Sequence, residues 1–312
     1  MASPATPAIR CSGLVKRYGD VVAVDGLDLE VRRGECFGML GPNGAGKTTT
    51  VEILEGLKVP DAGEVEILGE RWQGDGLGLR ARLGVQLQET KFPAKLSVRE
   101  VLTLFRSFYP SGPSVEETLA IVALQEKARA RVETLSGGQK QRLSLACGLV
   151  GDPELVFLDE PTTGLDPQSR RQAWEIVAGL KQRGRSVLLT THYREEAAQL
   201  CDRVAVADHG KVIALGTPRE LIASLGAEHV VEFALDDAAA VDETALAALP
   251  SVEGIAREDD SWHLTVREVH RAVPALLALL AARNLQPTHL TTHHATLEDV
   301  FVSLTGRSLR DA

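Results

Sequence analysis

Hydrophobic positions along the chain predict strands that alternate with helices. Two short runs, residues 36–40 and 155–158, are almost entirely apolar, and a third, residues 186–191, has an apolar centre. Runs of this length predict buried strands. The run at 155–158 shows no polar alternation, which is typical of a strand buried on both faces in a parallel sheet. Helices are predicted over residues 50–57, 96–109, 114–122, 140–150, 168–183 and 195–201. The pattern therefore predicts an α/β fold.

A separate antiparallel part is predicted before the first buried run. Residues 9–15, 21–25 and 27–31 are expected as β segments, with turns at Gly26 and at residues 33–34. The other expected segments are a strand at 64–69, a loop at 71–79, a strand at 83–88, and a hairpin of residues 203–207 and 212–215.

A glycine-rich segment joins the first buried run to the first helix. It matches the phosphate-loop pattern of Gly, four residues, then Gly-Lys-[Ser/Thr]. Its residues are Gly41, Pro42, Asn43, Gly44, Ala45, Gly46, Lys47, Thr48 and Thr49. The alternative is a glycine-rich turn with a chance lysine. The strand before the segment and the helix after it favour the phosphate loop.

The residue types of this segment suit a triphosphate. Gly44 and Gly46 allow a tight turn and a close approach to phosphate oxygens, because neither has a Cβ. Backbone amides and the positive end of the following helix can bind the anion. Lys47 can reach the β- and γ-phosphates, and the Thr48 hydroxyl can ligate Mg²⁺. The segment therefore predicts a nucleotide site.

Two further segments carry candidate chemistry. The apolar run at 155–158 ends in Asp159 and Glu160, at the strand end where open α/β sheets bind ligands. One interpretation is a metal-associated aspartate beside a catalytic glutamate, and the other is a structural pair of acids that caps a helix. The phosphate loop earlier in the chain favours the first interpretation. Residues 135–142 place a hydroxyl and two glycines before a helix, which suits an anion. A capped helix start explains the same residues.

Three side chains stay ambiguous when they are judged by residue type. The Tyr18 ring can stack on a nucleotide base, but residue type alone favours a half-buried tyrosine in a small sheet. Gln86 and Gln88 lie on one face of their predicted strand, because side chains alternate along a strand. Taken alone, each glutamine is expected to be a solvated polar residue.

Composition restricts the class of protein. The chain has 312 residues, which is enough for one large domain plus a smaller one, or for two domains. Of these residues 44% are hydrophobic and 25% charged, an ordinary composition for a soluble globular protein. The net charge of −9 comes without a dense basic block, which argues against nucleic-acid binding. The four cysteines are scattered and form no Cys-x-x-Cys pair. This excludes a disulfide framework or a zinc finger and suits a reducing cytosol.

Neither a signal peptide nor a membrane span is expected. Residues 1–6 lack the apolar core of a signal peptide. The longest apolar stretch, residues 272–282, contains Pro274 and is shorter than the about 20 residues that a spanning helix needs. We therefore expect a chain that is not itself embedded in a membrane.

The order of these motifs resembles that of the ATP-binding cassette (ABC) ATPases. Leu-Ser-Gly-Gly-Gln at 135–139 matches the family's signature, and Gln88, the two acids, Gly-Leu-Asp at 164–166 and His192 follow the family's order. The resemblance covers about residues 8–225. It implies a P-loop NTPase fold with a mainly parallel sheet core, an antiparallel β subdomain and a helical subdomain. It also implies ATP and Mg²⁺ as cofactors.

The resemblance implies a role for each matching residue. Tyr18 resembles the aromatic residue that stacks on adenine. Asp159 would hold Mg²⁺, and Glu160 would be the general base for the attacking water. Gln88 would sense both the Mg²⁺ and that water. His192 would contact the γ-phosphate, and together with the phosphate-loop lysine it would supply positive charge to the reaction.

The resemblance also implies partners. Two cassettes of this family dimerise head to tail, and Asp166 would communicate across their interface. The residues that would bind the ATP of the other protomer are Ser136, Gly137, Gly138 and Gln139. Because the chain has one phosphate loop and one signature, we expect a homodimer or a heterodimer with a second ABC cassette. A separate transmembrane permease would dock on the helices between Gln88 and Leu135, for which an ordinary helical layer is the alternative.

The pattern changes near residue 227, which predicts domains of residues 1–226 and 227–312. The second is expected to be a small α+β domain of two to three strands and helices. Its predicted segments are strands at 230–235 and 262–266, helices at 242–248, 268–283 and 297–307, and an extended segment at 288–291. His289, His293 and His294 are expected to be solvated, because no acid or cysteine completes a metal site at ligand spacing.

Short segments at 191–197, 297–301 and 304–307 resemble the ATPase subunits of drug, antibiotic and polysaccharide exporters. In that group the C-terminal domain is regulatory or stabilises the dimer. The resemblance thus implies the ATP-hydrolysing subunit of an exporter, cytoplasmic and bound to the inner face of the cell membrane through its permease. One alternative is a soluble ABC ATPase that acts on nucleic acid or a protein complex, which the acidic charge disfavours. Another is a binding-only regulator, which the intact Glu160 disfavours.

Overall fold

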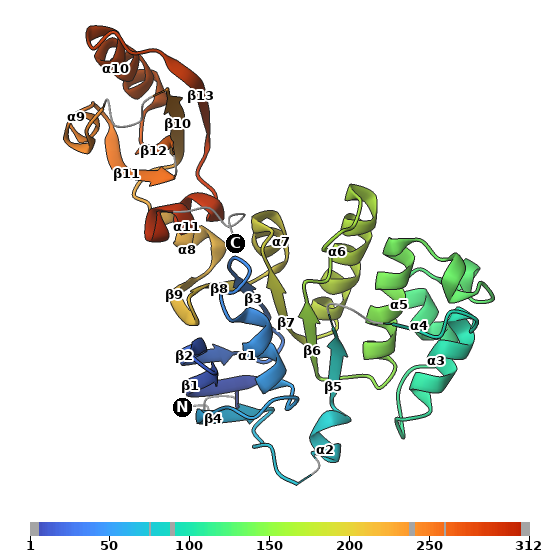
Figure 1. Ribbon diagram of the computed structural model, residues 1–312. Coiled ribbons are helices and arrows are strands. Elements are labelled where there is room, and N and C mark those ends of the chain that lie inside the picture. Colours follow the sequence, from blue (N-terminus) through green and yellow to red (C-terminus); the bar gives the residue numbers. More distant parts are fainter. Residues whose placement is uncertain (1–5, 75, 88–90, 237–240, 259, 307–312) are drawn as a thin grey trace. The chain divides into compact units, whose positions relative to one another are not determined.

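The structure of the protein is a computed structural model (Figure 1) that describes residues 6–74, 76–87, 91–236, 241–258 and 260–306. Contacts divide the chain into two compact units, Met1–Val212 and Ile213–Ala312. This division lies earlier than the expected domain boundary after residue 226. The difference consists of most of β9 (Lys211–Gly216) and all of α8 (Pro218–Ala223), which belong to the second unit.

Within the described residues, the main sheet has six strands in the order β5-β6-β7-β3-β8-β9. Its parallel strands are β5 (Leu83–Gln86), β6 (Leu155–Asp159), β7 (Ser186–Thr191), β3 (Cys36–Leu40) and β8 (Arg203–Asp208). β3, β6 and β7 are buried along their whole length, as expected for parallel strands covered on both faces. The three apolar runs are therefore confirmed as strands.

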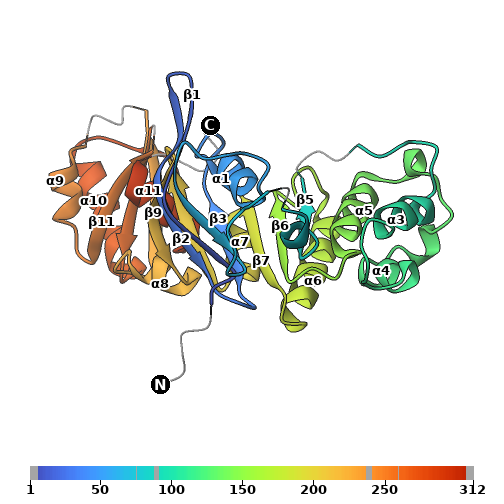
Figure 2. The ribbon, with the colours of Figure 1, turned by 90° about the horizontal axis from the view of Figure 1, so that it is seen from below.

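A second sheet of the first unit has the order β2-β1-β4 and is antiparallel. Its strands are β2 (Val21–Val31), β1 (Ile9–Tyr18) and β4 (Ala62–Ile67). The expectation of two β segments separated by a turn at Gly26 is wrong, because β2 runs through this residue. Gly26 has a φ of 69°, and the pairing register of β1 and β2 shifts nearby, so a bulge absorbs the glycine where a turn was expected. Figure 2 shows the long β1–β2 pair beside α1.

The core of the first unit lies between the two sheets. One buried cluster joins Leu14 and Val24 of the antiparallel sheet, Val51 and Ile53 of α1 (Lys47–Leu54), and Phe157 of the main sheet. The other face of the main sheet carries α6 (Pro167–Gln182) and α7 (Arg194–Leu200), which contact β7 and β3. Helix α1, which begins in the phosphate loop, packs between the two sheets, with contacts to β2 and β6.

A helical region follows β5 in the chain. It contains α3 (Val98–Arg106), α4 (Val115–Ile121) and α5 (Gly137–Leu149), which contact one another and lie together in Figures 1 and 2. Each helix begins with a serine whose side chain accepts a hydrogen bond from the backbone three residues later, in a capping box. Two short 3₁₀ helices, Gln125–Lys127 and Val132–Thr134, connect α4 to α5.

Two features of the first unit differ from the sequence prediction. The segment expected as a loop at 71–79 contains the start of a short helix, α2 (Leu77–Arg80). Gln86 is buried, so the expectation of a solvated side chain is wrong for this residue. Gln88 lies outside the described residues, so its role stays a prediction.

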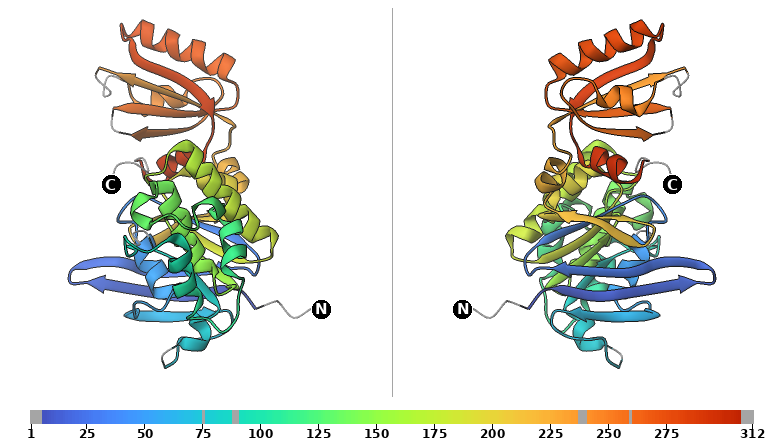
Figure 3. Two further views of the ribbon diagram at one scale, coloured as in Figure 1. Left: turned by 90° about the vertical axis from the view of Figure 1, so that its right-hand side faces the viewer. Right: turned by 90° about the vertical axis from the view of Figure 1, so that its left-hand side faces the viewer.

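The second unit has the strand–helix–strand–strand–helix–strand order of a split βαβ fold. In the described residues, its antiparallel sheet has the order β11-β12-β10-β13, with α10 along the sheet in Figure 3. The elements are β10 (His229–Leu235), α9 (Glu243–Ala247), β11 (Val252–Glu258), β12 (Ser261–Val266), α10 (Val269–Ala282), β13 (Pro287–His294) and α11 (Leu297–Thr305). The α+β class is as expected, but β11 was not predicted.

Other residues singled out in the sequence are now placed. His293 Nε2 lies 3.1 Å from Asp299 Oδ1, so His293 has a carboxylate partner and is not simply solvated. No group of three potential metal-ligating side chains occurs in the described ranges. Pro274 lies inside α10 without ending it. Across the described ranges, every helix is too short or too polar to cross a bilayer.

Candidate nucleotide site

The phosphate loop lies between β3 and α1, as the sequence predicts. Gly44 and Gly46 have φ values of 78° and 90°, a conformation that glycine adopts without strain. A Cβ on Gly46 would lie 2.2 Å from the carbonyl oxygen of Ala23. A Cβ on Gly41 would lie 2.3 Å from the carbonyl oxygen of Ala207. Conformation and close packing thus explain why glycines occupy these positions.

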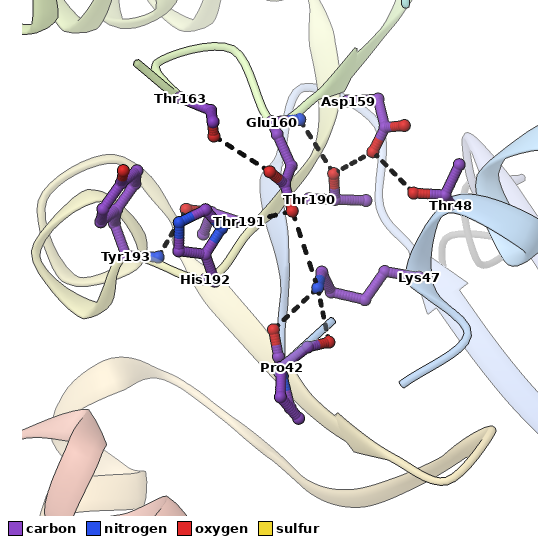
Figure 4. Close-up of polar contacts among 11 residues, drawn as sticks. Pro42, Lys47, Thr48, Asp159, Glu160, Thr163, Thr190, Thr191, His192 and Tyr193 are labelled. Atoms are coloured by element: carbon purple, nitrogen blue, oxygen red, sulfur yellow. Dashed lines mark hydrogen bonds and ion pairs between the residues drawn. The ribbon is translucent and has the colours of Figure 1, made fainter. Parts of the chain in front are cut away.

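Lys47 is the cation at the centre of the site. Its side chain is only 4% exposed, and Nζ donates hydrogen bonds to the carbonyl oxygens of Gly41 at 2.7 Å and Pro42 at 2.9 Å (Figure 4). Nζ also lies 3.8 Å from Glu160 Oε1. Burial lowers the pKa of Lys47, and the carboxylates of Glu160 and Asp159 act in the opposite direction. These contacts hold the ammonium group against the loop.

Asp159 ends β6 and meets two hydroxyl groups. Its Oδ1 accepts hydrogen bonds from Thr48 Oγ1 at 3.4 Å and from Thr190 Oγ1. Burial raises the pKa of Asp159, and the hydrogen bonds from Thr190 and Thr48 oppose this effect. The structure therefore brings together Thr48 and Asp159, the hydroxyl and carboxylate that the sequence assigns to Mg²⁺. Oxygen ligands of this kind suit Mg²⁺, which is commonly held by one or two carboxylates together with phosphates and waters.

Glu160 follows Asp159 and is held by its backbone and its side chain. Its φ of 48° is uncommon for a residue other than glycine. Its backbone N–H donates to the carbonyl oxygen of Thr190 at 3.2 Å and to Thr190 Oγ1 at 3.0 Å. Its Oε2 accepts a hydrogen bond from Thr163 Oγ1 at 3.0 Å. The carboxylate is thus oriented from several sides.

His192 completes this group of contacts. Its Nδ1 lies 3.3 Å from Glu160 Oε1, and this contact is the main reason that the pKa of Glu160 is lowered, although burial acts against it. The ring of Tyr193 packs against His192 with centroids 4.1 Å apart. In Figure 4 the side chains of Lys47 and His192 approach the Glu160 carboxylate from two sides. An ionised Glu160 between two basic groups is suited to accept a proton.

Sequence reasoning missed the contributions of Thr190 and Thr163. Thr190 pairs with Asp159 in the register of β6 and β7, and its hydroxyl contacts both acids of the site. The only signal of Thr190 in the sequence is that a hydroxyl residue lies near the end of a buried strand. The position beside the acids depends on strand order, which the sequence does not show.

The predicted signature segment forms the start of α5. Ser136 is the N-cap residue, and its backbone N–H donates to Gln139 Oε1 at 3.0 Å. Gly138 is buried against α6, where a Cβ would lie 2.3 Å from Ser169 Oγ. None of the residues 136–139 belongs to the labelled group in Figure 4. Within one chain, the two halves of the predicted site are therefore not joined by these contacts.

Asp166 and Tyr18 lie apart from the central contacts. Asp166 caps α6, accepting hydrogen bonds from the backbone N–H groups of Gln168 at 3.0 Å and Ser169 at 2.9 Å. The hydrogen bonds from Ser169 lower the pKa of Asp166. Tyr18 ends β1 and is 43% exposed. Lys58 Nζ lies 5.0 Å from the centre of that ring.

Comparison with known proteins identifies the family. A family model described as ABC transporter matches residues 24–163. The Nod factor export ATP-binding protein I of Ralstonia nicotianae is 41% identical to this chain, covering 98% of it and 96% of the relative. The protein of the same name from Paraburkholderia xenovorans is 43% identical, covering 97% of this chain and 99% of the relative.

Solved structures agree with this family. The cbiO1 protein from Clostridium perfringens, part of the ABC transporter complex cbiONQ, is 27% identical with a TM-score of 0.63, covering 70% of this chain and 91% of its own. The ATP-binding cassette MJ0796, a dimer in a post-hydrolysis state bound to ADP and Pi, is 25% identical to this chain with a TM-score of 0.61. The match covers 67% of this chain and 98% of the MJ0796 chain. The family resemblance and the P-loop NTPase fold are therefore confirmed. The chain belongs to the ATP-binding cassette family, as the ATP-binding subunit of an ABC transporter.

Proposed function

We propose that this chain hydrolyses ATP and that the hydrolysis drives export through a separate membrane permease. The observation that supports this proposal most strongly is the position of Glu160. Its carboxylate lies 3.3 Å from His192 Nδ1 and 3.8 Å from Lys47 Nζ, at the carboxyl end of a buried parallel strand. In the proposed reaction Glu160 orients the attacking water and accepts its proton. Lys47 and His192 supply positive charge near the transferred phosphoryl group.

Thr48 and Asp159 are the residues that we propose to hold Mg²⁺. The hydroxyl and the carboxylate lie 3.4 Å apart, and both are oxygen ligands. Thr190 holds the same carboxylate oxygen from the other strand. When bound, Mg²⁺ neutralises charge on the phosphate oxygens. Gln88 is proposed to contact the Mg²⁺ and the water, and Tyr18 to stack on adenine.

We further propose that the active unit is a head-to-tail dimer with a second cassette, identical or related. The signature residues Ser136, Gly137, Gly138 and Gln139 would bind the ATP held by the other protomer, and Asp166 would act across the interface. Two observations support this arrangement. The signature contacts do not join the phosphate-loop contacts within one chain, and a related cassette is described as a dimer. The N-terminus of α5 also suits a phosphate.

The permease is proposed to dock beside β5 and the helical region. A groove of about 410 Å³ lies there, and its apolar lining includes Leu57, Val85, Leu87 and Phe105. Leu57 and Leu87 are exposed, as are Leu104 and Phe108 on and after α3. A cluster of exposed apolar side chains beside a groove is typical of a protein-binding surface. Docking here would hold the chain at the inner face of the cell membrane.

Export is the direction that we propose, because the relatives that match nearly the whole chain are named as export proteins. We propose that residues 227–312 form a C-terminal domain that regulates or stabilises the dimer. The same relatives cover this region as well, since the matches extend over at least 97% of the chain.

The proposal is tested by affinity purification from detergent-solubilised membranes of the organism that encodes the chain. A tagged chain is used with ATP and Mg²⁺, and the Glu160→Gln variant is included to trap the dimer. Recovery of a polytopic membrane protein is expected. Recovery of only soluble proteins or nucleic acid would contradict the transport function.

A further inference from the structure

Glu55 is a buried acid that the nucleotide site does not use. It follows α1 as its C-cap residue and is 2% exposed. It lines the groove beside β5, together with Leu57, Val85, Leu87 and Phe105. Neither Oε1 nor Oε2 has a hydrogen-bond partner among the described residues. A buried carboxylate without a partner is costly, so its position in an open groove calls for an explanation.

The surroundings of Glu55 disfavour its negative charge. Burial, followed by the charges of Asp159 and Glu52, raises its pKa to about 8. The C-terminal end of α1 adds the partial negative charge of its carbonyl groups. The nearby Arg80 guanidinium donates to the carbonyl oxygen of Gly56 at 3.0 Å, and Lys58 Nζ lies 2.7 Å from Glu52. The groove therefore combines apolar walls with a buried acid whose ionised form an incoming cation would stabilise.

We propose that Glu55 receives a lysine or arginine side chain of the permease, on a cytoplasmic helix whose apolar neighbours fill the groove. This inference rests on the proposed function and adds the chemistry of the partner. A cation placed in the groove would pair with the Glu55 carboxylate and interact favourably with the end of α1. Arginine suits the site particularly well, because its guanidinium can bind both carboxylate oxygens. The guanidinium of Arg80 already donates a hydrogen bond to the neighbouring carbonyl oxygen of Gly56.

The proposed pair connects the docking groove to the nucleotide site. Helix α1 has eight residues and thus a length of about 12 Å. Lys47 and Thr48 lie at its start, and Glu55 directly follows its end. A partner that binds Glu55 is therefore in contact with the same rigid element that presents two residues to the phosphates.

The experiment uses the membrane purification described above, with two matched variants. Glu55→Gln removes the ionisable group and keeps the size of the side chain. Glu175→Gln removes an exposed carboxylate on α6, outside the proposed docking region, and serves as the control. The wild-type chain and Glu175→Gln are expected to recover the same polytopic membrane protein. Glu55→Gln is expected to recover at least about tenfold less, as when one partner of a buried charge pair is removed.

A double-mutant cycle identifies the partner residue. Each lysine and arginine in the cytoplasmic helices of the recovered protein is replaced by glutamine, and binding to wild-type chain and to Glu55→Gln is compared. One replacement is expected to weaken binding to the wild-type chain and to cause no further loss with Glu55→Gln. Thermal unfolding of Glu55→Gln at or above the wild-type midpoint shows that the variant is folded.

Two results separate failure of this inference from failure of the proposed function. If Glu55→Gln recovers the membrane protein as well as the wild-type chain does, or if no basic residue couples to Glu55, the inference is overturned and the transport function stands. If the wild-type chain recovers no membrane protein, the proposed function fails, and this inference fails with it.

Discussion

The buried Glu55 predicts an unusual dependence of stability on pH. Its pKa is about 8 in the folded chain, against an ordinary value of 4.5. The folded state therefore holds this proton more tightly than the unfolded state does. The stability that the proton contributes is complete below pH 4.5 and is lost as the pH rises through 8. Above that range both states have lost the proton, and the dependence on pH ends.

Glu55→Gln removes this dependence, because glutamine does not titrate. At about 1.4 kcal/mol per pKa unit, the unfolding free energy of the variant relative to wild type is expected to rise by about 4 kcal/mol between pH 5 and pH 9. At high pH the variant is expected to be the more stable of the two proteins, because the wild type must then bury a charged carboxylate. Both proteins are therefore expected to differ least at pH 5.

The assay is denaturant unfolding followed by tryptophan fluorescence at several pH values. Trp72 is a suitable reporter, because its Nε1 donates to the carbonyl oxygen of Leu54 at 3.2 Å, next to Glu55. Glu126→Gln, with an exposed carboxylate, is the control and is expected to follow the wild type. A difference between Glu55→Gln and wild type that stays constant from pH 5 to pH 9 would refute the reasoning.

Two further predictions concern the nucleotide site. Lys47→Ala removes a cation held by the Gly41 and Pro42 carbonyl groups. Equilibrium binding is expected to show a fall in ATP affinity on the order of tenfold to a hundredfold, as for the loss of charge-assisted hydrogen bonds. Unchanged affinity would contradict the role of Lys47. Ser136→Ala removes the cap of α5 and is expected to cost about 1 kcal/mol of stability. It is also expected to weaken ATP-dependent dimerisation of the Glu160→Gln chain in light scattering without changing ATP binding by the monomer, and full dimerisation would count against the signature role.

The parts of the fold that the sequence predicts are those with short-range patterns. The strand β3 is a continuous apolar run, β6 is apolar up to Asp159, and β7 has an apolar centre. The phosphate loop is a contiguous motif. The acids Asp159 and Glu160 are found because they end one of these runs. In each case the residues that determine the structure are neighbours in the chain, so no tertiary information is needed.

The features that the sequence misses depend on contacts between distant segments. β2 continues through Gly26 because pairing with β1 tolerates a bulge, and β11 is recognisable only by its pairing with β12. Thr190 reaches Asp159 through the register of two strands. Glu55 looks like a helix-surface acid in sequence, and only the packing of α1 reveals that it is buried. Strand order and burial are therefore the information that the structure adds.

Glu160 is proposed to be the general base of an ATPase. The most direct test of this role is the rate of phosphate release by the purified chain with ATP and Mg²⁺. Glu160→Gln is compared with wild type and with Glu195→Gln, which changes an exposed carboxylate on α7. We expect wild type and Glu195→Gln to hydrolyse ATP, and Glu160→Gln to bind ATP but to release phosphate about 10²- to 10⁴-fold more slowly. Hydrolysis by Glu160→Gln at the wild-type rate would contradict the account.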